Sequence, residues 1–397
     1  MVEQLASEEV AKALLEKGKE IVRQAQGLRA FDEEGEGEPL AREMGKAIEA
    51  YDEVVRRYAS EGNAAVREVV AEALMGKAGC LLTIKRYAET VAVFDDVVTR
   101  FGGATELGLR ERVAKALCAK GGCLSALKRS EESMAANAEL VTRFGGASEL
   151  PLRELVAKAL TNSGSVLIVL ERMEEAAAVF DELLGRFSAA AEPSLRAYVA
   201  RALNFKGGCL NTLKRKEEAL AAYDEVVARF GSATEFALRN EVATAILRKA
   251  GIFFELGRSA DESAAYDETV ARFGGATELA LREQVGTALL YKGTMLADLK
   301  RSAEELAVYD DVVARFGAAP EMVMCEVVAQ AIFNKGHRLG ALGRKQEAVA
   351  VYDALMEYVR KSTAGWIATM EQQGTWNLRQ LAMRGLKEKE AMLQGSA

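Results

Sequence analysis

Several residue types are scarce in this chain of 397 residues, and each scarcity excludes a class of structure or chemistry. The single histidine, His337, cannot by itself form a histidine-rich metal site. None of the four prolines interrupts an expected helix interior, which favours an all-helical fold. No segment approaches the run of about 18 apolar residues that a membrane-spanning helix needs. We therefore expect a helical protein that does not enter a membrane.

Acidic residues outnumber basic ones, 59 to 52. The net charge is −7 and the pI is near 5.3, which argues against a general affinity for nucleic acid or anionic membrane surfaces. The N-terminal segment has no basic stretch followed by an apolar run, so no signal peptide is expected. Of the five cysteines, only Cys118 and Cys123 are close together in sequence. Reduced, buried thiols in the cytoplasm fit this usage best.

A short segment recurs every 43 residues. The letters YDEVV at 51–55 return as FDDVV at 94–98, and the spacing continues without a slip to the last copy. Eight copies in register indicate a repeat array, because one unit cannot bury its apolar face alone and must stack on its neighbours. The eight anchor positions are Tyr51, Phe94, Asn137, Phe180, Tyr223, Tyr266, Tyr309 and Tyr352.

Each repeat is expected to contain two helices. In the fifth repeat, Leu203 and Leu210 follow helical spacing on a first helix, with Gly207 between them, and Tyr223 lies on a second helix. A small residue recurs at the position of Gly207 in every repeat, which predicts a close contact between two helices. The second helix is expected to end at Gly231 in a left-handed cap.

The pattern resembles the tetratricopeptide repeat family, whose motif is W-x2-L-G-x2-Y, then A-x3-F, then P. The same offsets carry Leu203, Lys206, Gly207, Leu210, Ala219, Tyr223 and Gly231 here. The small residues and the aromatic residue of the second helix match the motif, whereas the Trp, Leu, Tyr and Pro positions do not. The period is 43 rather than the family's usual value of about 34, and the extra residues at 233–241 lengthen the first helix. The resemblance implies a right-handed α-solenoid of stacked antiparallel helix pairs, with an inner groove that binds an extended peptide or a partner helix. A HEAT-like helical solenoid is the alternative fold.

The two ends depart from the repeat. Residues 1–60 predict an N-terminal capping helix pair with an acidic, glycine-rich insert at 31–39. Residues 61–361 hold seven 43-residue repeats, and 362–397 predict a degenerate capping repeat with both tryptophans, Trp366 and Trp376. Ala391 falls 43 residues after Ala348, so the cap is expected to include a shortened second helix. The insert is expected to be accessory to the fold.

No constellation of residues predicts catalysis. Cys325 and His337 are 12 residues apart on one expected helix, about 18 Å, which is too far for a nucleophile–base pair. Cys80, Cys123 and Cys209 recur in one packing position, as small buried side chains do. The acidic pairs after each anchor recur once per repeat and predict ion pairing. We expect no enzyme, no metal and no cofactor.

One face of the first helices varies between repeats while the core rows do not. By the resemblance this face lines the inner groove. It is basic and amide-bearing in the middle and more apolar toward the C-terminus, which predicts a protein or peptide partner with an acidic segment. Relaxed constraint at solvent-facing positions is the alternative explanation. The predicted groove residues are Lys115, Lys158, Arg201, Asn204, Asn211, Leu247, Phe254, Leu290, Phe333 and His337.

Two functions remain open at this point. The first is a non-enzymatic scaffold or adaptor that holds a peptide or protein segment in the groove. The second is a regulatory or sensor subunit that restrains an effector protein or binds a small ligand.

Overall fold

The computed structural model describes residues 2–28, 38–58, 60, 63–364 and 373–394. Within these ranges the chain forms helices and no strand, which confirms the all-helical prediction. Most of the acidic insert (31–37) and Trp366 lie outside the described residues. The predictions that the insert is accessory to the fold and that Trp366 belongs to the C-terminal cap therefore concern residues outside these ranges. The helices are α1 (Val2–Leu28), α2 (Glu38–Tyr58), α3 (Ala64–Thr83), α4 (Tyr87–Phe101), α5 (Leu107–Ala126), α6 (Ser130–Phe144), α7 (Leu150–Val169), α8 (Met173–Phe187), α9 (Pro193–Thr212), α10 (Lys216–Phe230), α11 (Phe236–Glu255), α12 (Ser259–Phe273), α13 (Leu279–Asp298), α14 (Ser302–Phe316), α15 (Met322–Ala341), α16 (Lys345–Ala364) and α17 (Gln373–Gln394).

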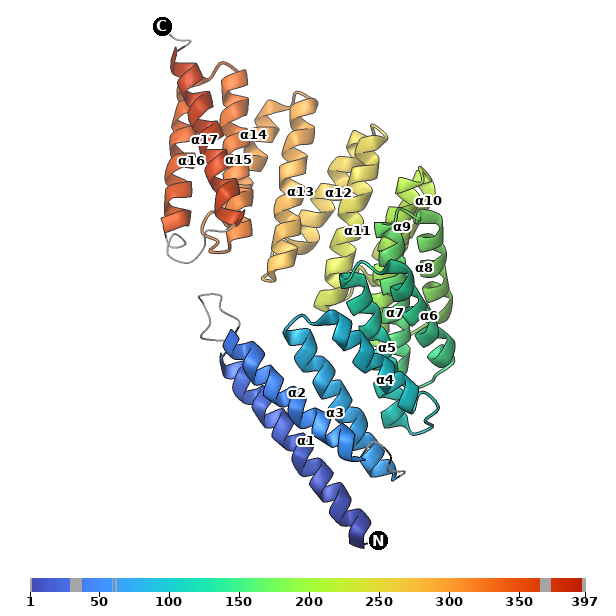
Figure 1. Cartoon of the computed structure of the whole chain (residues 1–397). Coiled ribbons are helices and arrows are strands. Elements are labelled where there is room, and N and C mark those ends of the chain that lie inside the picture. The colour runs from blue at the N-terminus through green and yellow to red at the C-terminus, as the bar shows by residue number, and fades with distance from the viewer. Residues whose placement is uncertain (1, 29–37, 59, 61–62, 365–372, 395–397) are drawn as a thin grey trace. The chain divides into compact units, whose positions relative to one another are not determined.

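The chain divides into two compact units, residues 1–213 with α1–α9 and residues 214–397 with α10–α17. Each unit is a stack of antiparallel helix pairs (Figure 1). We call the odd-numbered helices α3–α15 the A helices and the even-numbered helices α4–α16 the B helices. Within a unit each helix packs on the next one in the chain, and each A helix also contacts the following A helix.

The 43-residue period is exact in the helix boundaries. Every A helix from α3 to α15 has 20 residues, and every B helix from α4 to α14 has 15. Equivalent positions in different repeats can therefore be compared side chain by side chain. Within each unit, the residues at one contact between neighbouring repeats can therefore be compared with the residues at the equivalent contacts.

The left-handed residue lies at the end of the A helix, not at the end of the B helix. Gly231 has φ −61° and ψ −21°, a right-handed conformation, and Ser188 occupies the equivalent position. The prediction of a left-handed cap at Gly231 was therefore wrong. Instead, the Nη1 atom of Arg272 in the next repeat donates to the Gly231 carbonyl at 3.1 Å. The left-handed residues are Lys85, Lys128, Glu171, Lys214, Gly257, Lys300 and Gly343.

The recurring small residue is a close helix contact, as the sequence predicts. A Cβ atom built on Gly164 of α7 would lie 2.4 Å from Cζ of Phe180 in α8. In the same way, a Cβ atom on Gly293 would lie 2.4 Å from the Tyr309 ring. These two anchor rings therefore take the volume that a side chain on the A helix would need, which fixes the distance between the two helices.

The acidic residues beside the anchors form ion pairs, as expected. The first acid pairs with a lysine on the A helix of the next repeat, for example Lys120 Nζ to Asp95 Oδ1 at 2.5 Å. These pairs are partly exposed, so each contributes at most about 1 kcal/mol to stability. The same pairing recurs at Lys77–Asp52, Lys206–Asp181, Lys249–Asp224, Lys292–Asp267 and Lys335–Asp310.

Within residues 373–394, which the structure describes, the C-terminal segment forms one helix, α17, where the sequence suggested a shortened second helix. Ala391, which we expected in that second helix, lies in α17 together with the residues before it. Gly385 of α17 lies against Leu355 and the anchor Tyr352, because a Cβ atom there would lie 2.9 Å from Leu355 Cδ2.

Candidate binding pockets

Cavities occur at the same place in two different repeats. Each is bounded by an A helix, its own B helix and the A helix of the next repeat, and we call such a cavity a junction pocket. One lies between α5, α6 and α7, and the other between α11, α12 and α13. Their linings occupy equivalent positions three repeats apart. Ser125 corresponds to Phe254, and Asn162 corresponds to Tyr291.

The α5–α7 pocket has a volume of about 570 Å³ and a small, mostly neutral lining. Ser133 is buried and donates its hydroxyl proton to the Gly121 carbonyl at 2.7 Å. The lining combines serine hydroxyls with the aliphatic side chains of Val166, Val169 and Leu170. The lining residues are Gly121, Gly122, Ser125, Lys128, Ser130, Ser133, Asn162, Ser165, Val166, Val169 and Leu170.

Asn137 is a further unusual residue of this repeat. It holds the anchor position that an aromatic residue holds in the seven other copies, and it is fully buried. Neither its Oδ1 nor its Nδ2 atom has a hydrogen-bond partner among the described residues. A buried amide without partners costs free energy, so this anchor is less stable than its aromatic counterparts.

Restoring the aromatic anchor should stabilise the protein. We expect Asn137→Phe to raise the free energy of unfolding by about 1 kcal/mol or more, because it removes an unsatisfied buried amide. The ring has a precedent, since Phe180 packs on Gly164 as Asn137 packs on Gly121. Urea denaturation measures the change. Phe180→Asn is the reverse control and should be destabilising, and a lower stability of Asn137→Phe would contradict this account.

The α11–α13 pocket has a volume of about 370 Å³ and a very different lining. Phe254 and Tyr291 stand at the same positions as small polar residues of the other pocket, yet they are 61% and 58% exposed. Tyr266 lies behind them, with its ring centroid 6.4 Å from that of Tyr291. The pocket is therefore an aromatic recess open to solvent. Its lining residues are Leu247, Gly251, Phe254, Glu262, Tyr266, Tyr291, Thr294, Met295 and Asp298.

Two carboxylates complete this recess. Glu262 is 3% exposed, and Tyr266 donates its hydroxyl proton to Glu262 Oε1 at 3.1 Å. Burial raises the pKa of Glu262, and the charge of Asp298 raises it further. Among the residues that the structure describes, neither carboxylate forms an ion pair. The pocket therefore has negative charge on its wall and no cation of its own.

At the next junction, between α13, α14 and α15, an arginine of the protein itself meets the buried acid. Arg338 of α15 reaches the buried Glu305 of α14, with Nε 2.5 Å from Oε2. His337 is exposed and stacks on Phe333, with ring centroids 6.4 Å apart and an interplanar angle of 12°. At this junction the chain therefore supplies a cation to the buried carboxylate.

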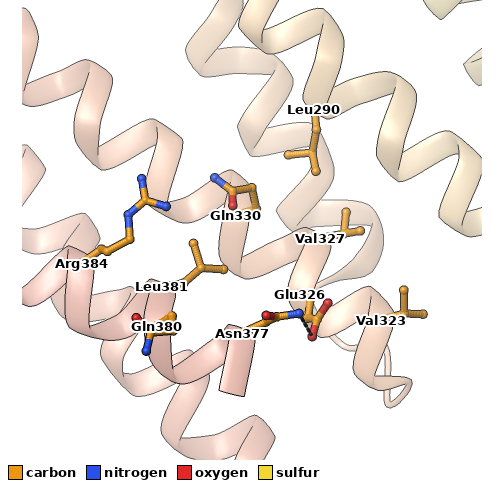
Figure 2. A pocket seen from close by; sticks show the side chains of 9 residues that line it. All are labelled: Leu290, Val323, Glu326, Val327, Gln330, Asn377, Gln380, Leu381 and Arg384. Carbon is orange, nitrogen blue, oxygen red and sulfur yellow. Dashed lines mark hydrogen bonds between the residues drawn. The ribbon is translucent and has the colours of Figure 1, made fainter. Parts of the chain in front are cut away.

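A further cavity of about 370 Å³ lies where α17 faces α15 (Figure 2). Asn377 of α17 donates to Glu326 Oε1 at 3.3 Å, and burial raises the pKa of Glu326. Figure 2 shows side chains of α15 and α17 on facing walls, with Leu290 of α13 at one end. The lining residues are Leu290, Val323, Glu326, Val327, Gln330, Asn377, Gln380, Leu381 and Arg384.

Comparison with known proteins agrees with this repeat geometry. The family model described as tetratricopeptide repeat matches residues 41–105 and 184–234. This chain is a tetratricopeptide-like repeat protein. The crystal structure of the apo form of RapI has 10% sequence identity and a TM-score of 0.54, with 96% of this chain and 99% of that chain covered. At that identity the likeness concerns the fold alone.

Two other solved structures are less similar. BtubC (BKLC) from P. vanneervenii has 11% identity and a TM-score of 0.46, with 59% of this chain and 90% of that chain covered. The apo form of the quorum sensor NprR from B. thuringiensis has 13% identity and a TM-score of 0.44, with 96% and 99% covered. The sequence matches none of the curated proteins.

The predicted groove residues of this tetratricopeptide-like protein fall into different environments. Leu247 and Phe254 line the α11–α13 pocket, and Leu290 lines the cavity beside α17. Phe333 is only 5% exposed, because Arg384 of α17 covers its ring with Cζ 4.5 Å from the centroid. A partner therefore cannot reach the Phe333 ring as the sequence suggested.

The amides of the predicted groove also differ from expectation. Asn204 is 4% exposed, so it lies on the buried side of α9 and is not a contact residue for a partner. Asn211 is half-buried near the end of the same helix. Sequence spacing placed both on the variable face but could not show how deeply each side chain lies.

The basic row is exposed as predicted. Lys115, Lys158 and Arg201 lie at equivalent positions on α5, α7 and α9. Acids that were not predicted as part of this face lie one turn earlier on two of these helices. Glu111 lies 3.4 Å from Lys115 Nζ, and Glu154, at the equivalent position, accepts a hydrogen bond from Ser194. The spacing of four residues between each of these acids and the following lysine was the sequence signal for this neighbouring charge. The acids partly neutralise the positive charge of the row.

The described residues contain no arrangement suited to metal binding or nucleophilic catalysis. No three His, Cys, Asp or Glu side chains within these ranges converge to hold a metal ion. All five cysteines are buried and unpaired, and burial raises the pKa of Cys80 and of Cys209 to about 11. Thiols with such pKa values are almost entirely protonated at neutral pH and are poor nucleophiles. No described helix is long and apolar enough to cross a membrane.

Proposed function

We propose that this protein is a non-enzymatic, cytoplasmic scaffold or adaptor that holds a peptide or protein segment against the face of its A helices. The observation that carries the proposal is the α11–α13 pocket with its two exposed aromatic residues, Phe254 and Tyr291. Concave sites with apolar walls and a few polar groups are typical of ligand recognition. Exposed aromatic side chains at such sites commonly supply most of the binding energy.

The pocket is suited to an extended segment or a partner helix. It opens between two neighbouring A helices, so a segment crossing them could insert one side chain there and contact the flanking repeats with others. The α5–α7 pocket offers the same opening, with serine hydroxyls and aliphatic side chains in its lining and no aromatic residue. In this arrangement each repeat contributes one contact of its own chemistry.

Removal of an exposed aromatic side chain should weaken binding. A segment can be selected from a phage-displayed random peptide library on the wild-type protein. We expect Phe254→Ala to weaken that segment about tenfold or more, because truncation of a buried aromatic contact typically costs about 2 kcal/mol or more. Fluorescence anisotropy measures the affinity.

The chain offers a matched control. Phe236 lies on the same helix, is 46% exposed and does not line the pocket, so Phe236→Ala should bind like wild type. Equal affinities of the Phe254→Ala and wild-type proteins would place the binding site elsewhere. X-ray scattering with and without the segment adds a second readout. An unchanged profile fits a scaffold, whereas a changed profile would assign the alternative role of a sensor.

The basic row leads us to propose further that the partner carries an acidic segment. Reversal of Lys115, Lys158 and Arg201 to Glu should weaken binding of such a segment, because attraction is lost and repulsion is added. Raised salt should weaken wild-type binding in the same assay. The control reverses the turn residues Lys85, Lys214 and Lys300, since Glu171 already occupies that turn position in another repeat. Equal effects of the two triple variants would mean that net charge, and not this face, is responsible.

A further inference from the structure

Two neighbouring repeats contain the same buried acid. Glu262 of α12 and Glu305 of α14 are 43 residues apart in sequence and are 3% and 2% exposed. A tyrosine follows each by four residues and hydrogen-bonds to it, Tyr266 in one repeat and Tyr309 in the other. The two sites are thus built alike up to this point, and a buried carboxylate in such a site needs a cation or a proton.

The repeats differ in what meets the acid. In the later repeat the Nε atom of Arg338 lies 2.5 Å from Glu305 Oε2. The residue 43 positions before Arg338 is Met295, which has no charge. Glu262 therefore lacks the guanidinium that its counterpart has, and the α11–α13 cavity lies at that position.

The rest of the cavity suits a guanidinium group. Asp298 adds a second carboxylate, and it too has no ion-pair partner among the described residues. Phe254 and Tyr291 present exposed rings, on which a planar guanidinium stacks favourably. The long aliphatic part of an arginine side chain would lie against Leu247 and Met295. Negative charge, aromatic faces and apolar walls together favour a cationic side chain over a neutral or acidic one.

We propose that the α11–α13 junction pocket binds an arginine side chain of the partner, with its guanidinium paired to Glu262 and Asp298. The inference rests on the proposed function, which it narrows by naming the residue that this pocket takes. The protein's own Arg338–Glu305 pair is the internal precedent for the contact. The part of the partner that binds the α11–α13 pocket therefore carries a basic residue. This is compatible with an acidic segment at Lys115, Lys158 and Arg201, because those residues belong to the other unit.

A capped amino acid tests the pocket without any knowledge of the partner. The probe is N-acetyl-arginine N-methylamide, titrated into protein with ¹³C-labelled methionine methyl groups and followed through the Met295 resonance. The matched probe is the citrulline analogue, which has nearly the same shape but no charge. We expect the arginine probe to bind about tenfold more tightly, because hydrogen bonds between charged groups are the stronger ones.

Three variants sharpen the test. Met295→Arg supplies the missing internal cation, so it should fill the cavity and abolish binding of the arginine probe. Because the Met295 signal is lost there, binding is read from labelled tyrosine rings. Glu262→Gln keeps the shape and should remove the preference for arginine over citrulline, even if Met295→Arg does not fold. Glu268→Gln changes an acid on the same helix that pairs with Arg272, and it should bind both probes like wild type.

The outcomes separate this inference from the proposed function. Equal affinity for the arginine and citrulline probes, or no shift at about 50 mM arginine probe, would overturn the arginine assignment. Tighter binding of free arginine than of the capped probe would also overturn it, in favour of a free small molecule. In each case peptide capture that is lost in Phe254→Ala would still support the scaffold. Binding of the arginine probe without any peptide capture would leave the pocket assigned and the scaffold refuted.

Discussion

Gly164→Leu should lower the free energy of unfolding by about 3 kcal/mol, at the upper end of the usual cost of overpacking a core. A Cβ atom alone would lie 2.4 Å from Cζ of Phe180, far inside van der Waals contact. The Phe180 ring cannot move aside easily, because it is fully buried and stacks on Phe205 with ring centroids 5.4 Å apart. The larger side chain must therefore separate α7 from α8.

Urea denaturation followed by circular dichroism measures this effect. The control is Gly122→Leu in α5, one residue after a close-contact glycine, because Gly122 is exposed and a Cβ atom there would meet nothing within 4 Å. Gly122→Ala should even stabilise the helix by up to about 1 kcal/mol. If Gly164→Leu and Gly122→Leu unfolded at the same urea concentration, the close packing of the small row would not be a determinant of stability.

Arg338→Met should also cost about 3 kcal/mol at neutral pH, because it leaves the buried Glu305 without its cation. The change copies the residue found one repeat earlier, where Met295 faces Glu262. We place the cost at the lower end for buried pairs, since the Arg338 side chain is 22% exposed. Thermal and urea unfolding measure it. The control is Arg315→Met, which removes a surface pair with Asp311 and should cost at most about 1 kcal/mol.

The pH dependence gives this prediction a sign. Burial raises the pKa of Glu305 even with Arg338 and His337 nearby, and loss of Arg338 should raise it further. A group with a raised pKa in the folded state contributes stability that is present below its unfolded pKa and is lost as pH rises through the folded pKa. The difference between Arg338→Met and wild type should therefore be large at pH 7 and shrink toward about pH 4. A difference independent of pH would mean that lost packing, and not the unpaired carboxylate, causes the effect. Alanine occupies the position equivalent to Glu305 in two other repeats, at Ala219 and Ala348. The double variant Arg338→Met/Glu305→Ala should therefore regain part of the stability that Arg338→Met loses.

The sequence alone determined the repeat, the helix pairs and the close contacts between them. Each repeat packs mainly on its neighbours, so the same contacts recur in every repeat. The residues that make these contacts therefore recur in the sequence at a spacing of 43 residues. The contact of Gly164 with Phe180 could therefore be predicted from the small row. The exposure of Lys115, Lys158 and Arg201 also followed from the helical face. Spacing was sufficient for these features because each depends on positions within one or two adjacent helices.

The tertiary structure decided what breaks the repeat. Gly385 of α17 lies against the anchor Tyr352, and the burial of Phe333 depends on Arg384 from that same helix. Likewise, Glu262 is one acid among many in the sequence, and only the folded chain shows it buried beside Met295 without a cation. Side chains from three helices meet at a junction pocket, so its charge balance and its open volume arise only when those helices are packed together.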